Sequence, residues 1–312
     1  MTDAAFALAL EAAIGYPAWL QRRVGHPVEW IGAVITALDR QLNREEAPAS
    51  WRRLNGVITA AVVVACGAGF GLGLRSIARR SGHRRVLSAL FATAGLAQRS
   101  LHDHVAAVRR PLRQGELNLA RTAVARIVGR DVDGLDEAGV AAAALESLAE
   151  SFNDGVVAPA FWLAVGGLPG LYAYKALNTA DSLIGHREPR WRAFGWAAAR
   201  ADDLANLVPA RLAGALIALA GGGGWRTMAR DAPRHASPNA GWPEAAMAGA
   251  LKVRLGGPAR YDGALTERPA FNDGAPPPTP EHLTQGLAVY RGACILLGVG
   301  LAAWALAGRR RL

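Results

Sequence analysis

The sequence predicts an all-α, polytopic helical membrane protein with about four to five transmembrane segments, one of them broken or re-entrant. Hydrophobic residues make up 51% of the 312 residues and charged residues only 19%, below the roughly 25% usual for soluble proteins. The apolar residues are also bunched. Residues 55–74 and 156–174 are uncharged runs of 20 and 19 residues, close to the roughly 20 that a helix needs to cross a bilayer.

Five apolar segments follow from this pattern, and we expect them to form a single membrane-embedded domain over residues 1–312. They lie near 4–20, 55–74, 156–174, 204–224 and 292–308. The first and fourth segments each carry one charge, Glu11 and Arg211. The alternative is a large soluble helical core, which we disfavour because soluble helices of this length usually keep a charged face.

The third segment contains Gly166-Gly167-Leu168-Pro169-Gly170 near its middle. Glycine is entropically costly in a helix and proline lacks a backbone donor, so this cluster predicts the end of one helix and the start of another. Two half-length helices would form a hairpin that enters the membrane and returns. Because irregular backbone at membrane depth is tolerated only where protein or water covers it, we expect this segment to line a pocket.

Charge and motif content narrow the class of function. The net charge is +10, and all but two of the 35 basic residues are arginines, nine of which fall between residues 75 and 113. Such a balance suits nucleic acid, an anionic membrane surface or a phosphorylated ligand, and the positive-inside rule would place the 75–113 stretch in the cytoplasm. The sidedness of the other loops stays open.

Several classes of site are absent from the sequence. The basic loops lack interleaved aromatic residues, so we expect no nucleic-acid partner. The two cysteines and seven histidines show no zinc-binding spacing, and no phosphate-binding glycine loop is present. The informative polar motifs instead occupy residues 75–155, 178–203 and 225–285.

Three acids in the first of these stretches fall at helical spacing. Glu146, Glu150 and Asp154 lie four residues apart, which places them on one face of an α-helix. A solvated helix face is the ordinary explanation of such a pattern. Here no basic residue interleaves, and like charges at this spacing destabilise a helix unless a cation binds them. Carboxylates are ligands that Mg²⁺ prefers, so the face is a candidate metal site.

The remaining polar candidates gather at the ends of apolar segments and in one loop. They are Lys175, Asn178, Asp181, Ser182 and Arg187, then Arg200, Asp202, Asp203 and Asn206, and finally His235, Ser237 and Asn239. Caps, interface anchors and an ordinary turn are the alternatives. Ionisable groups against a membrane segment are costly, which favours a functional role. Neighbouring helical residues point about 100° apart, so Asp202 and Asp203 are expected to serve different partners.

Six sequence blocks, taken in order along nearly the whole chain, resemble the cobalamin-biosynthesis CobD/CbiB family. They are HPVEWIG (26–32), ARTAVARIVGRD (120–131), ALESLAESFNDGVVAPAFW (144–162), YKALNTADSLIGH (174–186), ARADDLANLVPARL (199–212) and HASPNAG (235–241) with the LGG at 255–257. The family usually begins with an Asp and a Gly-Asp-Pro, where this chain has Glu11 and Gly15-Tyr16-Pro17. One acid of that motif is therefore missing here.

The resemblance implies an adenosylcobinamide-phosphate synthase, a multi-pass protein of the cell inner membrane. Such an enzyme is an ATP-dependent acid–amine ligase. It joins adenosylcobyric acid to (R)-1-amino-2-propanol or its O-phosphate through an amide, giving adenosylcobinamide or its phosphate. Its expected cofactors are ATP and Mg²⁺, and its expected partners are the corrinoid, the aminopropanol, the lipid bilayer and other cobalamin-pathway enzymes.

On this resemblance, the expected chemistry activates a carboxylate as an acyl phosphate, which requires cations against the transferring phosphoryl group. The candidate catalytic acids are Glu146, Glu150, Asp154, Asp181, Asp202 and Asp203, with Mg²⁺ on Glu150, Asp154 and Asp202. Candidate substrate or phosphate contacts are Arg130, Lys175, Asn178, Ser182, Arg187, Arg200, Asn206, His235, Ser237 and Asn239.

Two other functions remain open from the sequence. A corrinoid or small-solute transporter would share broken helices and buried acids, although no inverted repeat relates the two halves of this chain. A non-catalytic membrane scaffold for other enzymes would use the acids only to pair with arginines.

Overall fold

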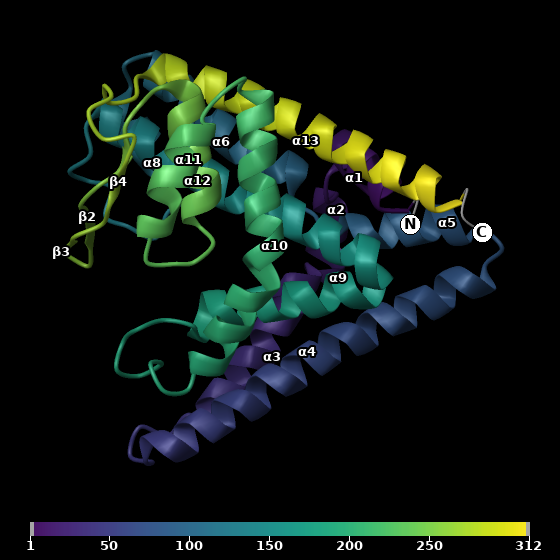
Figure 1. Cartoon of the computed structure of the whole chain (residues 1–312). Helices are drawn as coiled ribbons and strands as arrows, with labels where there is room; N and C mark the ends of the chain where they lie inside the picture. Colours follow the sequence, from purple (N-terminus) through teal and green to yellow (C-terminus); the bar gives the residue numbers. More distant parts are fainter. Residues whose placement is uncertain (1–2, 310–312) are drawn as a thin grey trace. The chain divides into compact units, whose positions relative to one another are not determined.

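The computed structural model describes residues 3–309 and is almost entirely helical (Figure 1). Four helical stretches are long and apolar enough to cross a membrane: Ala49–Arg80, Glu137–Ile184, Trp196–Ala220 and Pro280–Ala307. This finding confirms the predicted all-α, polytopic membrane protein.

The chain folds into two compact units, which are described separately. Unit 1 consists of Met1–Ala97, Ala158–Asn206 and Leu301–Leu312, and unit 2 of Gln98–Val157 and Leu207–Gly300. Both units are therefore assembled from stretches that are distant in the sequence. The single membrane-embedded domain expected over residues 1–312 stays a prediction.

The first apolar segment is divided into two short helices. α1 (Asp3–Ile14) ends before Gly15, whose φ of +60° leaves the helical region, and α2 (Ala18–Val24) begins after Pro17. The 12 residues of α1 span about 18 Å, less than the roughly 30 Å hydrocarbon core of a bilayer. The segment predicted at 4–20 therefore adds no continuous span to the four long helices.

Unit 1 is built around two helices that approach each other closely. α4 (Ala49–Arg80) packs along α9 (Ala158–Ile184), and α3 (Pro27–Leu42) packs against both (Figure 1). A Cβ added to Gly67 would lie 2.4 Å from the carbonyl oxygen of Tyr172, and one added to Gly71 would lie 2.4 Å from that of Leu168. The two glycines are four residues apart, the spacing that lets helix backbones meet in membranes.

α9 is broken at Gly167, as the sequence predicts. The residue has φ +64° and ψ −157°, outside the helical region, and Pro169 follows in the first turn of the second half. The chain folds back here, because a Cβ on Gly170 would lie only 2.6 Å from the carbonyl oxygen of Trp162. Two residues eight positions apart in a straight helix would be separated by about 12 Å. The predicted break and reversal are confirmed, and re-entry into a membrane stays a prediction.

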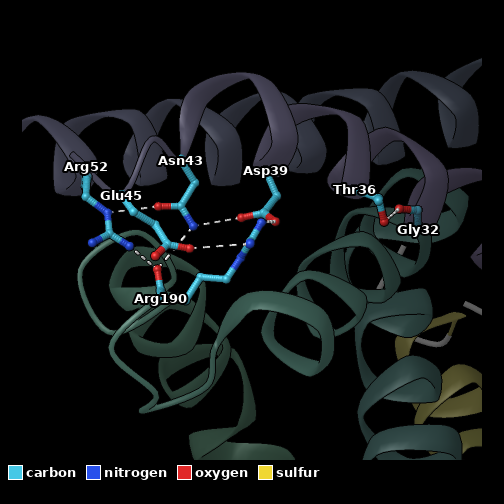
Figure 2. A network of polar contacts seen from close by, with 7 residues as sticks. All are labelled: Gly32, Thr36, Asp39, Asn43, Glu45, Arg52 and Arg190. Carbon is cyan, nitrogen blue, oxygen red and sulfur yellow. Dashed lines mark hydrogen bonds and ion pairs between the residues drawn. The ribbon is translucent and has the colours of Figure 1, made fainter. Parts of the chain in front are cut away.

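A polar network fixes the loop that joins α9 to α10 (Trp196–Ala220) (Figure 2). The Arg190 guanidinium lies 3.0 Å from Asp39 and 3.5 Å from Glu45. Asn43 donates to Asp39 at 2.8 Å and to the carbonyl of Arg190 at 3.1 Å, and the Arg52 side chain donates to the same carbonyl. The loop is thereby tied to α3 and to the start of α4, which fixes where α10 begins.

Unit 2 surrounds α8 (Glu137–Phe152), whose alanine-rich middle is fully buried. Three helices pack against it: α6 (Gln98–Arg113), α7 (Leu117–Val124) and α12 (Gly241–Leu251). α11 (Trp225–Asp231) packs on α12, and α13 (Pro280–Arg309) begins in this unit. Alanine side chains on α8 allow these neighbours to approach without large cavities.

Two small antiparallel ladders lie in the segment that follows α12. β1 (Leu255–Gly256) pairs with β4 (Ala270–Phe271), and β2 (Ala259–Tyr261) pairs with β3 (Ala264–Thr266). The pairing folds residues 255–271 into a compact flap, which was expected only as a loop. β1 contacts α8, so the flap lies over the helix that carries the predicted acids.

The predicted acidic face does not continue as an α-helix through Asp154. α8 ends at Phe152, and a π-helix occupies Asn153–Val157. The expected α-helix therefore ends two residues before Asp154, which lies in a different helix type from Glu146 and Glu150. A shared face of the three acids stays a prediction.

Gly71→Ala is expected to lower the free energy of unfolding by about 1–3 kcal/mol, because the new methyl group would collide with the backbone of α9. Gly69→Ala is the matched control, since nothing lies within 4 Å of a Cβ built there. The control should change stability by no more than about 1 kcal/mol. Denaturant unfolding in detergent measures both. Equal effects would contradict the close packing of α4 on α9.

Candidate functional site

A buried cluster of charges in unit 2 brings together residues from four parts of the chain. We define the ion-pair cluster as Arg130, Glu146, Glu244 and Arg268. Glu146 lies 3.3 Å from the Arg130 guanidinium and 3.4 Å from that of Arg268. Arg268 in turn lies 3.6 Å from Glu244. All four side chains are largely buried, with Glu244 only 2% exposed.

The flap supplies Arg268 to this cluster and adds a backbone donor. Pairing of β1 with β4 places the Gly256 amide where it donates to Glu146 at 2.8 Å, and it brings Arg268 to the same carboxylate. Gly256 has φ +73°, and a Cβ there would lie 2.4 Å from the carbonyl oxygen of Pro269. Glycine is therefore required at this position of the LGG block. Glu146 anchors the flap to α8.

The pKa values of Glu244 and Arg268 are both raised, for different reasons. Burial raises the pKa of Glu244 well above its ordinary value, and repulsion from Glu150 and Glu146 adds to the effect. Burial alone would lower the pKa of Arg268, but the carboxylates of Glu146 and Glu244 outweigh it and raise the pKa. Glu244 thus keeps its proton to a higher pH than an exposed glutamate. Its Oε2 atom has no hydrogen-bond partner, which marks it as a buried polar atom with unused capacity.

A second buried carboxylate in unit 2, that of Asp231, holds two chain segments together. Asp231 is fully buried, lies 2.7 Å from the Arg230 guanidinium and accepts from the Asn272 amide at 2.8 Å. The hydrogen bond from Arg230 lowers the pKa of Asp231, and the amide of Asn272 acts in the same direction. Asp231 ties the end of α11 to the strand end beyond the flap. Nothing in the sequence pattern singled it out.

Unit 1 contains a separate hydrogen-bonded network of polar side chains. Asp202 accepts from Asn206 at 2.9 Å and from Asn178 at 3.4 Å, and all three side chains are buried. The Asn206 oxygen accepts from the Tyr174 hydroxyl at 3.1 Å, and the Lys175 ammonium lies 3.4 Å from the Asn178 oxygen. Four predicted site residues therefore meet in unit 1. Tyr174 was not predicted.

The other predicted residues of unit 1 lie outside this network. Asp203 pairs with Arg200 at 3.4 Å, so it has a different partner from Asp202, as expected. The Ser182 hydroxyl donates to the backbone carbonyl of Asn178 at 2.9 Å, an intrahelical bond. Asp181 is half-buried and Arg187 is exposed.

The His235, Ser237 and Asn239 motif forms a turn before α12. The Ser237 amide donates to the His235 ring at 3.0 Å, and the Ser237 hydroxyl accepts from the amides of Asn239 and Ala240. The Asn239 oxygen accepts from Arg211 at 3.1 Å. These bonds shape the chain locally, as serine and asparagine commonly do in turns.

The structure does not group the predicted metal ligands into one metal site. Glu146 does not fit a metal ligand, because Arg130, Arg268 and the Gly256 amide occupy its oxygens. Within residues 3–309, no group of three or more His, Cys, Asp or Glu side chains is arranged to hold a metal ion. Glu150 and Asp154 belong to unit 2 and Asp202 to unit 1. Mg²⁺ binding by these three residues stays a prediction.

An apolar pocket in unit 1 adjoins Lys175. It encloses about 630 Å³ of empty space, counting its open mouth. Its wall comes from α3, α4 and α9 and includes three aromatic side chains, Trp30, Phe70 and Tyr172, with Lys175 as the one basic residue of its lining. An apolar wall with a single charged group is typical of small-molecule sites, because the charge orients the ligand.

Glu244→Gln is expected to change how stability depends on pH. Since the folded protein raises the pKa of Glu244, it binds that proton more tightly than the unfolded chain does. Wild-type stability should therefore fall as pH rises above 4.5, the ordinary glutamate value, towards the raised pKa. The uncharged amide removes this loss, so the variant should gain on wild type as pH increases.

Denaturant unfolding in detergent at several pH values measures this difference, and Glu267→Gln on the exposed side of the flap is the control. Parallel stability curves for wild type and Glu244→Gln across this range would show that Glu244 titrates as an ordinary exposed acid.

Comparisons with known proteins agree with the resemblance seen in the sequence. The family model described as CobD/Cbib protein matches residues 4–290. A cobalamin biosynthesis protein CobD from Rhodobacter capsulatus is 48% identical over 307 residues, covering 96% of this chain and 97% of the relative. One from a Sinorhizobium species is 49% identical over 304 residues, covering 94% of each chain.

A further relative of the same name, from Brucella suis biovar 1, is 48% identical over 277 residues, covering 85% of this chain and 84% of the relative. No solved structure matches the chain significantly. With a family match over most of its length and close relatives along nearly all of it, the chain belongs to the CobD/Cbib protein family.

Proposed function

We propose that this protein acts in cobalamin biosynthesis as a membrane-bound acid–amine ligase. It joins adenosylcobyric acid to (R)-1-amino-2-propanol or its O-phosphate, forming adenosylcobinamide or its phosphate. Family membership and the shared name of its relatives support the pathway. The four long apolar helices support a location in a membrane, and we assign it to the cell inner membrane.

The observation that carries the proposal is the apolar pocket of unit 1 with Lys175 at its edge. A corrinoid acid combines an apolar ring with a carboxylate, and the reaction takes place at that carboxylate. Trp30, Phe70 and Tyr172 offer flat apolar surface for an edge of the ring. The Lys175 ammonium provides a positive charge for the carboxylate, which cannot accept an amine until its own charge is neutralised or activated.

The network beside Lys175 holds this ammonium in position. Lys175 lies 3.4 Å from the Asn178 oxygen, and Asn178 donates to Asp202, which also accepts from Asn206. A buried carboxylate with two amide donors is held in one orientation. Asp202 is thereby linked to the Lys175 ammonium through the side chain of Asn178.

ATP, when bound, would supply the phosphoryl group that converts one oxygen of the substrate carboxylate into part of a phosphate leaving group. Mg²⁺ binding is part of this proposal, with Glu150 and Asp154 as candidate ligands in unit 2 and Asp202 as a candidate ligand in unit 1. The chain's own contribution is to bind the ring edge, to orient the carboxylate and to exclude water from the pocket.

Lys175→Gln should reduce amide formation on the order of tenfold to 100-fold, since it removes one charged contact of about 1.5–3 kcal/mol. Purified protein in detergent is supplied with the corrinoid acid, the amine, ATP and Mg²⁺. The product is separated by chromatography, identified by mass spectrometry and quantified. Lys252→Gln is the matched control, because Lys252 is exposed and is the only other lysine in the sequence.

Undiminished product from Lys175→Gln would remove the basis for placing the carboxylate in this pocket. Corrinoid entry into proteoliposomes without product would instead identify a transporter. Binding of another pathway enzyme without any turnover would identify a scaffold.

Asp202→Asn should reduce amide formation more strongly than Asp203→Asn. The first removes a buried charge from the Lys175 network, whereas the second affects a half-buried acid paired with Arg200. The same product assay measures both, and thermal unfolding shows whether each variant is folded. Equal losses in two folded variants would contradict a special role for Asp202.

A further inference from the structure

A second hollow in unit 1 has the opposite character from the apolar pocket. It encloses about 920 Å³ of space, counting its open side. Arginines Arg75, Arg79 and Arg84 line it together with Ser88, and the broken part of α9 at residues 163–168 lines it as well. Three positive side chains therefore converge on one cavity.

Local structure explains why these arginines face the same space. Arg75 and Arg79 are four residues apart near the end of α4, so they lie on one side of that helix. The chain then turns at Gly82, with φ +70°, and enters α5 (Arg84–Thr93). Arg84 and Ser88 are again four residues apart, and α5 packs against both α4 and α9. Two helix faces are thereby brought onto one cavity.

Among the described side chains, none lies within ion-pairing distance of Arg75, Arg79 or Arg84, and none accepts a hydrogen bond from them. Residues 47–102 contain no Asp or Glu, and the part of α9 before Asp181 contains none either. In the ion-pair cluster of unit 2, by contrast, each arginine has a carboxylate partner. Three unneutralised like charges around one cavity favour an anionic occupant.

The break in α9 adds a further positive group. The second half of α9 starts after Gly167, and Gly166, Gly167 and Leu168 line the hollow. The first amide groups of a helix lack intrahelical acceptors and carry partial positive charge. Nothing lies within 4 Å of a Cβ built on Gly166, so the backbone there is open to a ligand.

We propose that this hollow binds a phosphate group carried on a larger molecule. Arginine forks bind phosphate oxygens in pairs, and the start of a helix adds backbone donors to such a site. The phosphate ester has two sources: the headgroup of an anionic phospholipid, since Arg75 and Arg79 lie at the end of a helix long enough to span a membrane, or a soluble phosphorylated molecule. The proposal does not depend on amide-forming activity.

The test compares two double variants that remove the same charge from neighbouring positions. Arg79→Gln/Arg84→Gln alters the lining of the hollow, whereas Arg80→Gln/Arg85→Gln alters exposed arginines that do not line it. The full-length protein in non-ionic detergent is titrated with inorganic phosphate by calorimetry. In the second arm, phosphatidylglycerol and phosphatidylcholine are added, and the bound lipids are counted by native mass spectrometry.

The lining pair should weaken binding of one anionic probe by at least about tenfold per arginine, and the control pair should leave it nearly unchanged. Loss confined to phosphatidylglycerol identifies a lipid headgroup, and loss of inorganic phosphate identifies a soluble ester. Equal weakening by both pairs, or binding of neither probe by wild type, overturns the proposal. If the lining pair fails to fold, Arg75→Gln replaces it, with Arg80→Gln as its control.

Discussion

The structure of unit 1 depends on the close approach of α4 to α9. Gly67 and Gly71 remove the side chains that would otherwise separate the two backbones, and they do so opposite Tyr172 and Leu168. The contact lies next to the break at Gly167, so it supports the one place where α9 reverses. A broken helix in a membrane is stable only where neighbouring protein or water satisfies its backbone, and α4 supplies that neighbour. Both hollows of unit 1 border this contact, since Gly67 lines the apolar pocket and Leu168 lines the arginine-rich one.

The two units contain charged side chains in two different situations. In unit 2, Glu146 satisfies two arginines and a backbone amide at once, which compensates the several kcal/mol that removing each ion from water costs. In the arginine-rich hollow of unit 1 the charges remain accessible and uncompensated. The first arrangement holds a flap in place and is satisfied without a ligand. We propose that a bound anion balances the second.

The sequence predicted the fold better than it predicted the site. Long apolar runs identified the four helices that could span a membrane, and the Gly-Gly-Leu-Pro-Gly cluster identified the reversal in α9, because both are local features. The division of the first segment at Gly15 also had a local signal. The Gly-Tyr-Pro sequence predicts a break in a helix, although it entered the sequence analysis only as part of the family motif. There the Tyr16 hydroxyl donates to the Gly25 carbonyl at 2.8 Å, which fixes the bend before α3.

The functional site was harder to predict from the sequence, because its contacts join residues that are distant along the chain. Arg130 and Glu146 were both predicted, but as a phosphate contact and a catalytic acid rather than as each other's partner. Glu244 and Arg268 were missed, since they lie about 100 residues further along the chain, in segments without a recognisable motif. The helical spacing of Glu146, Glu150 and Asp154 predicted one continuous α-helix, yet a π-helix begins at Asn153. The spacing of these acids carries no signal for a change of helix type.

The ion-pair cluster also explains why an acid with a raised pKa persists in the interior. A protonated Glu244 is neutral, so it adds no third negative charge to a group in which Glu146 and Glu150 already oppose two arginines. If Glu244 lost its proton, the extra charge would have to be met by Arg268, which already pairs with Glu146. Arg268 stands between β3 and β4, so any change in its pairing acts directly on the flap. Arg268 therefore links Glu244 of α12 and Glu146 of α8 to the flap.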